Sequence, residues 1–255
     1  MDIVQISKDV LIRLTQMDHE RIGGNSKERL IFPNKFPSDL KNKGITEKEL
    51  LKYTRISEQE LRFLFVEQFI KDTSNDFFYS VETPTEFKYK LGENFESIAC
   101  GIGRSASIDM SIFKRDENEK YNRLLNIEFK NQNSSRFSIG KDVLKLMHEK
   151  QNGAFIILLK NTDKGTLVNL GETGVLDKLY KSFEKFKNYW QGEDKIIQLI
   201  IISLEVKENK MSSFLIHQKI KKGDLLQDVF SFEGKLSDVN ELKSMGWEIE
   251  RIGRK

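Results

Sequence analysis

Residues 105–113 read S-A-S-I-D-M-S-I-F, and residues 124–130 read L-L-N-I-E-F-K. In both stretches polar and apolar residues alternate, which is the pattern of a β-strand with one buried face. The alternation places Asp109 on the polar face of the first strand, and Glu128 and Lys130 on the polar face of the second. These stretches decide the fold, because they predict two adjacent strands that carry two acids and a lysine on one face of a sheet.

The segment between the two strands, K-R-D-E-N-E-K-Y-N-R at 114–123, is too polar to bury and predicts a hairpin loop. A hairpin that is symmetric about 118–119 places Asp109 directly opposite Glu128. Directly opposed side chains have Cβ atoms about 4.5–5.5 Å apart, so these carboxylates repel each other unless a cation lies between them. A register shift of two residues would separate the pair.

Two carboxylates beside a lysine suit a hard divalent ion. Mg²⁺ binds oxygen ligands and is usually held by one or two carboxylates together with water and substrate phosphate. Such an ion lowers the pKa of a bound water. Lys130 would position or deprotonate that water, or stabilise the developing anion, and the sequence does not choose among these roles. We therefore expect Asp109 and Glu128 to hold Mg²⁺ or Mn²⁺ next to a phosphodiester.

The arrangement of Asp109 before the tripeptide Glu128-Phe129-Lys130 resembles the PD-(D/E)xK, or restriction-endonuclease-like, nuclease superfamily. The chain departs from the motif at Ile108, where the family pattern has proline. The resemblance implies an α/β fold with a restriction-endonuclease-like core, in which helices flank a central mixed β-sheet. N- and C-terminal additions extend this core.

The segment S-E-Q-E-L-R-F-L-F-V-E-Q-F-I, which starts at Ser57, predicts a helix over 58–72. Ser57 and Glu60 have capping-box spacing at its start. The resemblance implies a further catalytic and metal-binding acid on this helix. Glu67 is the best match, and Glu60 is the reserve, although an ordinary solvent-facing role explains Glu67 equally well.

The segment after the hairpin predicts a helix over 139–151, capped by Ser138, and then the wholly apolar strand A-F-I-I-L-L. Continuous apolar strands are typical of buried, often parallel, sheets. Lys141, Lys145 and His148 share another face of the helix. They either contact DNA phosphates or form a solvated surface.

The resemblance divides the chain into three parts. Residues 1–55 form an N-terminal extension of helix and loop, residues 56–160 form the nuclease core, and residues 161–255 form a C-terminal extension that packs on the core. We find no repeat, low-complexity tract or flexible linker, which favours one compact unit.

Composition excludes several classes of protein. The chain has 255 residues, of which 38% are hydrophobic, so it can build a substantial core. One cysteine and three histidines exclude an internal disulfide and a zinc finger. No apolar run approaches the ~20 residues of a membrane span, and the first residues do not resemble a signal peptide. We expect a cytoplasmic protein with no membrane partner.

The function that these observations predict is a Mg²⁺-dependent nuclease that hydrolyses DNA. The resemblance implies a bacterial restriction, phage-defence or DNA-repair setting. It also implies a homodimer or a targeting partner protein, because cutting two strands needs two sites. Three alternatives remain: a catalytically inactive nucleic-acid-binding module on the same fold, a nuclease that cleaves RNA, and a protein-interaction domain.

Overall fold

The computed structural model describes residues 1–21, 24–35, 46, 53–160, 164–167, 174–204, 212–230 and 239–253. The strands are β1 (Phe77–Lys90), β2 (Ala99–Cys100), β3 (Arg104–Arg115), β4 (Tyr121–Asn131), β5 (Asn152–Lys160), β6 (Ile196–Leu204), β7 (Ser212–Lys221) and β8 (Glu248–Gly253). The α-helices are α1 (Ile3–Gln16), α3 (Glu58–Asp72), α4 (Arg136–His148), α5 (Lys164–Leu167), α6 (Val175–Phe186) and α7 (Leu226–Phe230). Short 3-10 helices are η2 (Phe95–Ser97), η3 (Lys187–Tyr189) and η4 (Val239–Met245).

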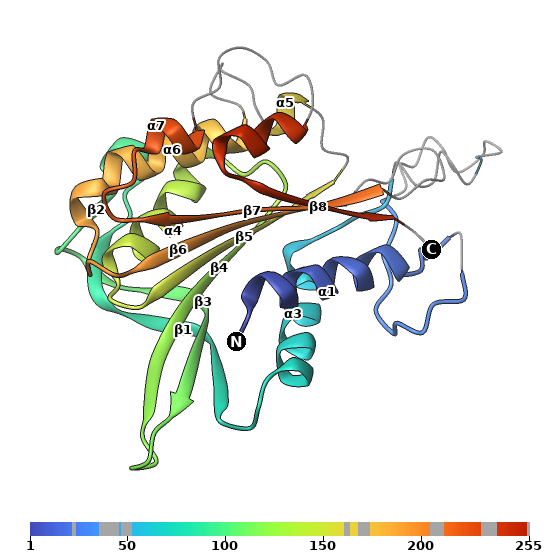
Figure 1. Cartoon of the computed structure of the whole chain (residues 1–255), viewed down its shortest axis with the longest axis horizontal. Helices are drawn as coiled ribbons and strands as arrows, with labels where there is room; N and C mark the ends of the chain where they lie inside the picture. The colour runs from blue at the N-terminus through green and yellow to red at the C-terminus, as the bar shows by residue number, and fades with distance from the viewer. Residues whose placement is uncertain are drawn as a thin grey trace.

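The eight strands form one sheet in the order β2-β1-β3-β4-β5-β6-β7-β8 (Figure 1). Strands β4, β5 and β6 are parallel, and all other neighbours are antiparallel. The apolar run predicted to form a parallel strand is β5, which is buried on both faces. The prediction of an α/β protein with a central mixed sheet flanked by helices is confirmed. Strands β6, β7 and β8 show that residues after 160 extend this same sheet.

Helices cover the sheet on two sides, and each side has its own apolar core (Figure 1). Helices α1 and α3 pack on one face, where Phe65 meets Phe129 edge-on at 5.3 Å between ring centroids. Helices α4, α6 and α7 pack on the other face. Because side chains alternate along β4, Ile127 and Phe129 point to α3, whereas Glu128 and Lys130 point to α4.

The helices before and after the hairpin form close to where the sequence places them. The helix predicted over 58–72 is α3, with the predicted capping box at its start. Helix α4 begins earlier than predicted, because the Ser135 hydroxyl, and not Ser138, caps it by accepting from the backbone N–H of Ser138 at 3.2 Å. Strand β1 continues through Pro84, where a register shift accommodates the missing N–H.

The register predicted for the hairpin is confirmed over its inner part. The observed pairs are Met110–Ile127, Ser111–Asn126 and Ile112–Leu125. A bulge follows Ile112 toward the turn. In the other direction the pairing ends at Met110–Ile127, beyond which β3 continues only with β1 and β4 only with β5. The sheet therefore forks just where Asp109 and Glu128 lie.

Candidate active site

Asp109 lies at this fork and is held from two sides. Its Oδ2 accepts a hydrogen bond from the backbone N–H of Phe129 at 2.8 Å, which takes the place of a ladder bond between the strands. Arg62 of α3 donates to the Asp109 carbonyl at 3.1 Å, and its Nη2 lies 3.7 Å from Asp109 Oδ1. The Asp109 side chain keeps 17% of its surface exposed.

Glu128 is the buried acid of the site. Its Oε1 lies 2.6 Å from Nζ of Lys145, while Oε2 has no hydrogen-bond partner among the described residues. Burial raises the pKa of Glu128 well above its usual value, repulsion by Asp142 and Asp109 adds to this rise, and Lys145 offsets part of it. An unpartnered carboxylate oxygen in a buried position is costly unless another group binds it.

Two residues of α4 connect the acids and lysines into one chain of ion pairs. Asp142 Oδ2 lies 2.5 Å from Nζ of Lys130, and Asp142 Oδ1 lies 2.9 Å from Nζ of Lys145. Burial opposes ionisation of Asp142, yet the two lysines together hold its pKa below the usual value. Burial likewise opposes the charge of Lys130, but Asp142 and Glu128 raise its pKa overall. We call Glu128, Lys130, Asp142 and Lys145 the buried ion network.

A third acid, Glu58, reaches the same region from the first residue of α3. Its Oε1 lies 3.8 Å from Nη1 of Arg62. Burial raises the pKa of Glu58; Lys130 opposes this rise, and Asp109 adds to it. Glu58 therefore lies close enough to Asp109 and Lys130 for their charges to influence it.

The structure does not bring Glu67 or Glu60 to the fork. Glu67 is 64% exposed and its Oε2 pairs with Arg13 of α1 at 2.6 Å. Glu60 caps its own helix, since its Oε2 accepts from the backbone N–H of Ser57 at 2.8 Å. At about 100° per residue, the nine positions from Glu58 to Glu67 turn the helix by two and a half turns, to the opposite side. The role of Glu67 stays a prediction, and Glu58 is the acid of α3 that lies beside Arg62, which in turn contacts Asp109.

The basic stripe considered for α4 does not form on the surface. Lys145 is only 6% exposed because it belongs to the buried ion network, and His148 is 9% exposed and packs its ring 4.5 Å from that of Phe87. Lys141 lies over the ring of Phe137, outside the network. The α4 side chains thus serve the sheet face, and a phosphate-binding stripe is not among their roles.

Asp142, Lys145, Glu58 and Arg62 are the residues of the site that the sequence analysis did not assign. One signal was present: Asp142 and Lys145 are three residues apart beside the apolar positions of α4, the spacing at which side chains on a helix are neighbours. A charged pair beside an apolar stripe indicates burial against a partner. Glu58 gave no such signal, because an acid in the first turn of a helix is ordinarily explained by its favourable interaction with the helix dipole.

The oxygen atoms at the fork can be compared with the ligands that a divalent ion requires. Among the described residues, no three His, Cys, Asp or Glu side chains gather into a metal-binding group. Two carboxylates, those of Asp109 and Glu128, lie at the fork and influence each other's charge, and Glu128 Oε2 is a buried oxygen without a hydrogen-bond partner. This set fits Mg²⁺ or Mn²⁺ in the mode where one or two carboxylates bind the ion, and water and substrate phosphate complete its ligands.

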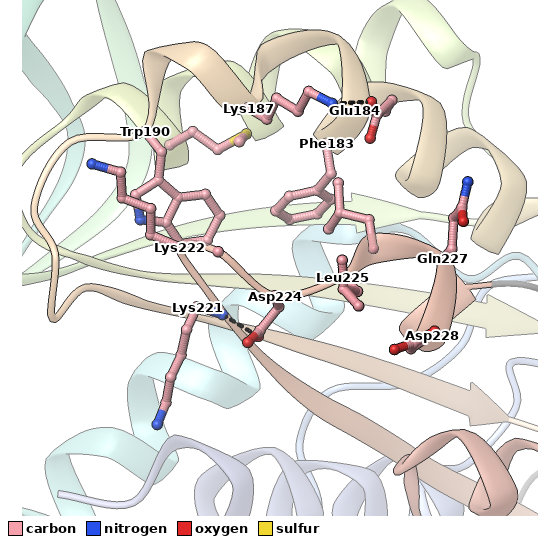
Figure 2. A pocket seen from close by; sticks show the side chains of 13 residues that line it. Phe183, Glu184, Lys187, Trp190, Lys221, Lys222, Asp224, Leu225, Gln227 and Asp228 are labelled. Carbon is pink, nitrogen blue, oxygen red and sulfur yellow. Dashed lines mark hydrogen bonds and ion pairs between the residues drawn. The ribbon is translucent and has the colours of Figure 1, made fainter.

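A separate cavity of about 370 Å³ lies between α6, η3 and the turn from β7 to α7 (Figure 2). Phe183 and Trp190 form its apolar wall, and three lysines and three acids line it. Lys187 pairs there with Glu184. None of the fork residues lines this cavity.

No protein-family model matches the sequence, and no curated protein is significantly similar to it. Across the described ranges, no helix is both long enough and apolar enough to cross a membrane.

Proposed function

We propose that the protein is a metal-dependent nuclease of the PD-(D/E)xK type that hydrolyses DNA phosphodiester bonds. The setting that we propose is bacterial restriction, phage defence or DNA repair in the cytoplasm, with a second copy or a targeting partner where both strands are cut. One observation carries the proposal: Asp109 and Glu128 lie at the point where β3 and β4 separate, and Lys130 shares the α4 side of β4 with Glu128.

Each residue has a defined role in this proposal. Asp109 and Glu128 would hold Mg²⁺ or Mn²⁺, and the ion would lower the pKa of a water and neutralise phosphate charge. Arg62 fixes the backbone and carboxylate of Asp109. Lys130 is held by Asp142 as a fixed cation, which suits stabilisation of the developing anion better than proton abstraction. Phosphate approaches the partly exposed Asp109 and Lys130, behind which Glu128 is buried.

The test is cleavage of plasmid and linear DNA in the presence of Mg²⁺ or Mn²⁺. Asp109→Asn and Lys130→Met keep the side-chain shape and remove the charge. We expect each to lower the rate by roughly 10²–10³-fold, as loss of one pre-organised electrostatic group does in other enzymes. Lys141→Met, on the neighbouring helix but outside the network, is the matched control and should cleave normally. Equal cleavage by wild type and both site variants would exclude this assignment.

A second candidate is an inactive nucleic-acid-binding or protein-interaction module on the same fold. The observation in its favour is that Lys145 already neutralises Glu128 without any ion. DNA binding in the absence of divalent ions, with no cleavage of DNA or of an RNA substrate in their presence, would support it. Cleavage of RNA alone would instead identify a ribonuclease.

A further inference from the structure

The ammonium group of Lys145 is surrounded like a coordinated cation. Its Nζ lies 2.6 Å from Glu128 Oε1, 2.9 Å from Asp142 Oδ1 and 2.8 Å from the carbonyl oxygen of Ser107. A lysine ammonium has three protons, and three oxygens surround it here. The Ser107 carbonyl is available because β3 has already separated from β4 at this position.

The same three oxygens are the kind that a hard divalent ion binds, namely carboxylates and a backbone carbonyl. Lys145 is 6% exposed and Glu128 is fully buried, so water screens neither charge. Lys130 lies 2.5 Å from Asp142, and Lys145 is the only cation within ion-pair distance of Glu128 among the described residues. Lys145 is thus the counter-charge of the proposed metal ligand.

We propose that Lys145 is a positioning residue and a built-in competitor of the divalent ion. Its ammonium holds the Glu128 carboxylate in place when no ion is bound, and its positive charge lowers the affinity of the fork for that ion. The inference rests on the proposed function and names how the same site is regulated: the site fills only at ion concentrations high enough to overcome Lys145. Lys145 repels the divalent ion whether its ammonium moves away from Glu128 or stays at Oε1. The ion can still bind Oε2, because Oε2 is the oxygen without a hydrogen-bond partner.

The test measures ion binding separately from cleavage. Ca²⁺ and Mn²⁺ are titrated into wild type and Lys145→Met by calorimetry, and thermal unfolding is recorded with and without each ion. Lys145→Met keeps most of the length and the unbranched apolar stem of the side chain but removes its charge. We expect roughly tenfold or tighter ion binding in this variant, because unit charges a few ångströms apart interact by several times the thermal energy. We also expect the ion to raise its unfolding temperature more than that of wild type.

Two controls separate charge from shape. Lys145→Arg keeps the positive charge and should bind the ions as weakly as wild type. Lys141→Met removes a lysine from the same helix outside the network and should also match wild type. Ion affinity that is unchanged in Lys145→Met overturns the inference.

Lys145→Met can lose stability, so a second variant keeps the test decisive. Lys145→Met combined with Glu128→Gln removes both charges of the pair; it should fold and lose its response to the ions. If Lys145→Met alone folds only in excess Ca²⁺, the inference is supported; if it stays unfolded even then, the ion does not replace the ammonium and the inference fails. If wild type cleaves DNA but Lys145→Met binds the ions with unchanged affinity, the inference about Lys145 is refuted and the proposed nuclease function is not. If Lys145→Met binds the ions tightly but no variant cleaves, the proposed nuclease function is refuted and the inference about Lys145 is not.

Discussion

Two clusters of charged side chains, each including residues of a helix that flanks the sheet, have similar N–O distances and differ in exposure. One is the buried ion network defined above, with distances of 2.5–2.9 Å and side-chain exposures of 1–15%. The other, which we call the surface cluster, consists of Arg13, Glu28 and Glu67, with distances of 2.6–2.8 Å and exposures of 18–64%. The N–O distances therefore do not distinguish the two clusters, whereas their exposure to water does.

The two clusters differ in the surroundings that a charged side chain would have after its partner is removed. A side chain of the surface cluster can return to water, so an exposed pair contributes about 0–1 kcal/mol. A member of the buried ion network cannot, and removal of one partner leaves an uncompensated charge in the interior. Apolar residues of similar volume could fill the same space without the cost of an uncompensated buried charge. A buried network that alternates acid and lysine is hence better explained by the chemistry of the fork than by stability.

The largest expected effect is the loss of Asp142. Asp142→Ala should lower the free energy of unfolding by about 3–5 kcal/mol, because Lys130 and Lys145 both lose a buried counter-charge. Urea denaturation at neutral pH measures the change. Glu184→Ala, which breaks an exposed pair with Lys187 on α6, is the control and should cost at most about 1 kcal/mol. If the two substitutions cost the same, burial does not separate the clusters as argued.

An intermediate effect, and a dependence on pH, is expected at Glu28. Arg13 donates two hydrogen bonds of 2.8 Å to this carboxylate and lowers its pKa below the usual value of a glutamate. A pKa that is lower in the folded state stabilises the fold above the unfolded value, and this stabilisation is lost as the pH falls through the folded pKa. Glu28→Gln should thus cost about 1 kcal/mol at pH 7.

The difference in unfolding free energy between wild type and Glu28→Gln should shrink as the pH falls below 4.5. Urea denaturation of both proteins at pH 7, 5 and 3.5 provides the series, where these pH values are chosen about the usual range of glutamate. A difference that grows toward low pH would contradict the sign of the shift. It would then place Arg13 closer to Glu67 than to Glu28 in its energetic effect.

The parts of this site that could be predicted from sequence are the local ones. Strand alternation has a period of two, so Glu128 and Lys130 share a face of their strand, and Asp109 is placed on the same face by the predicted register. The register could also be predicted, and the pair Met110–Ile127 next to the site confirms it.

The remaining parts depend on how elements meet. Periodicity assigns a helix at 58–72 but does not fix which of its acids turns toward the fork, because that is decided by how α3 rotates against β4. Burial of Lys145 likewise follows from the packing of α4 over the fork, where Ser107 and Glu128 supply acceptors from two different strands. A lysine read from the sequence alone looks solvated, since lysine is almost never fully buried unless it is paired.

The smallest expected effect is at Glu67, and it tests the rotation of α3 directly. Glu67 is 64% exposed, and Arg13 keeps Glu28 as a partner when Glu67 is lost. Glu67→Gln should change the free energy of unfolding by less than about 0.5 kcal/mol and should leave DNA cleavage unchanged. Glu58→Gln, on the opposite side of the same helix, should lower cleavage because Glu58 lies beside Arg62 and is influenced by the charges at the fork. Parallel rates for both variants, measured on one plasmid with Mg²⁺, provide the comparison. If Glu67→Gln abolishes cleavage while Glu58→Gln does not, α3 presents its other face to the substrate and the motif match to Glu67 stands.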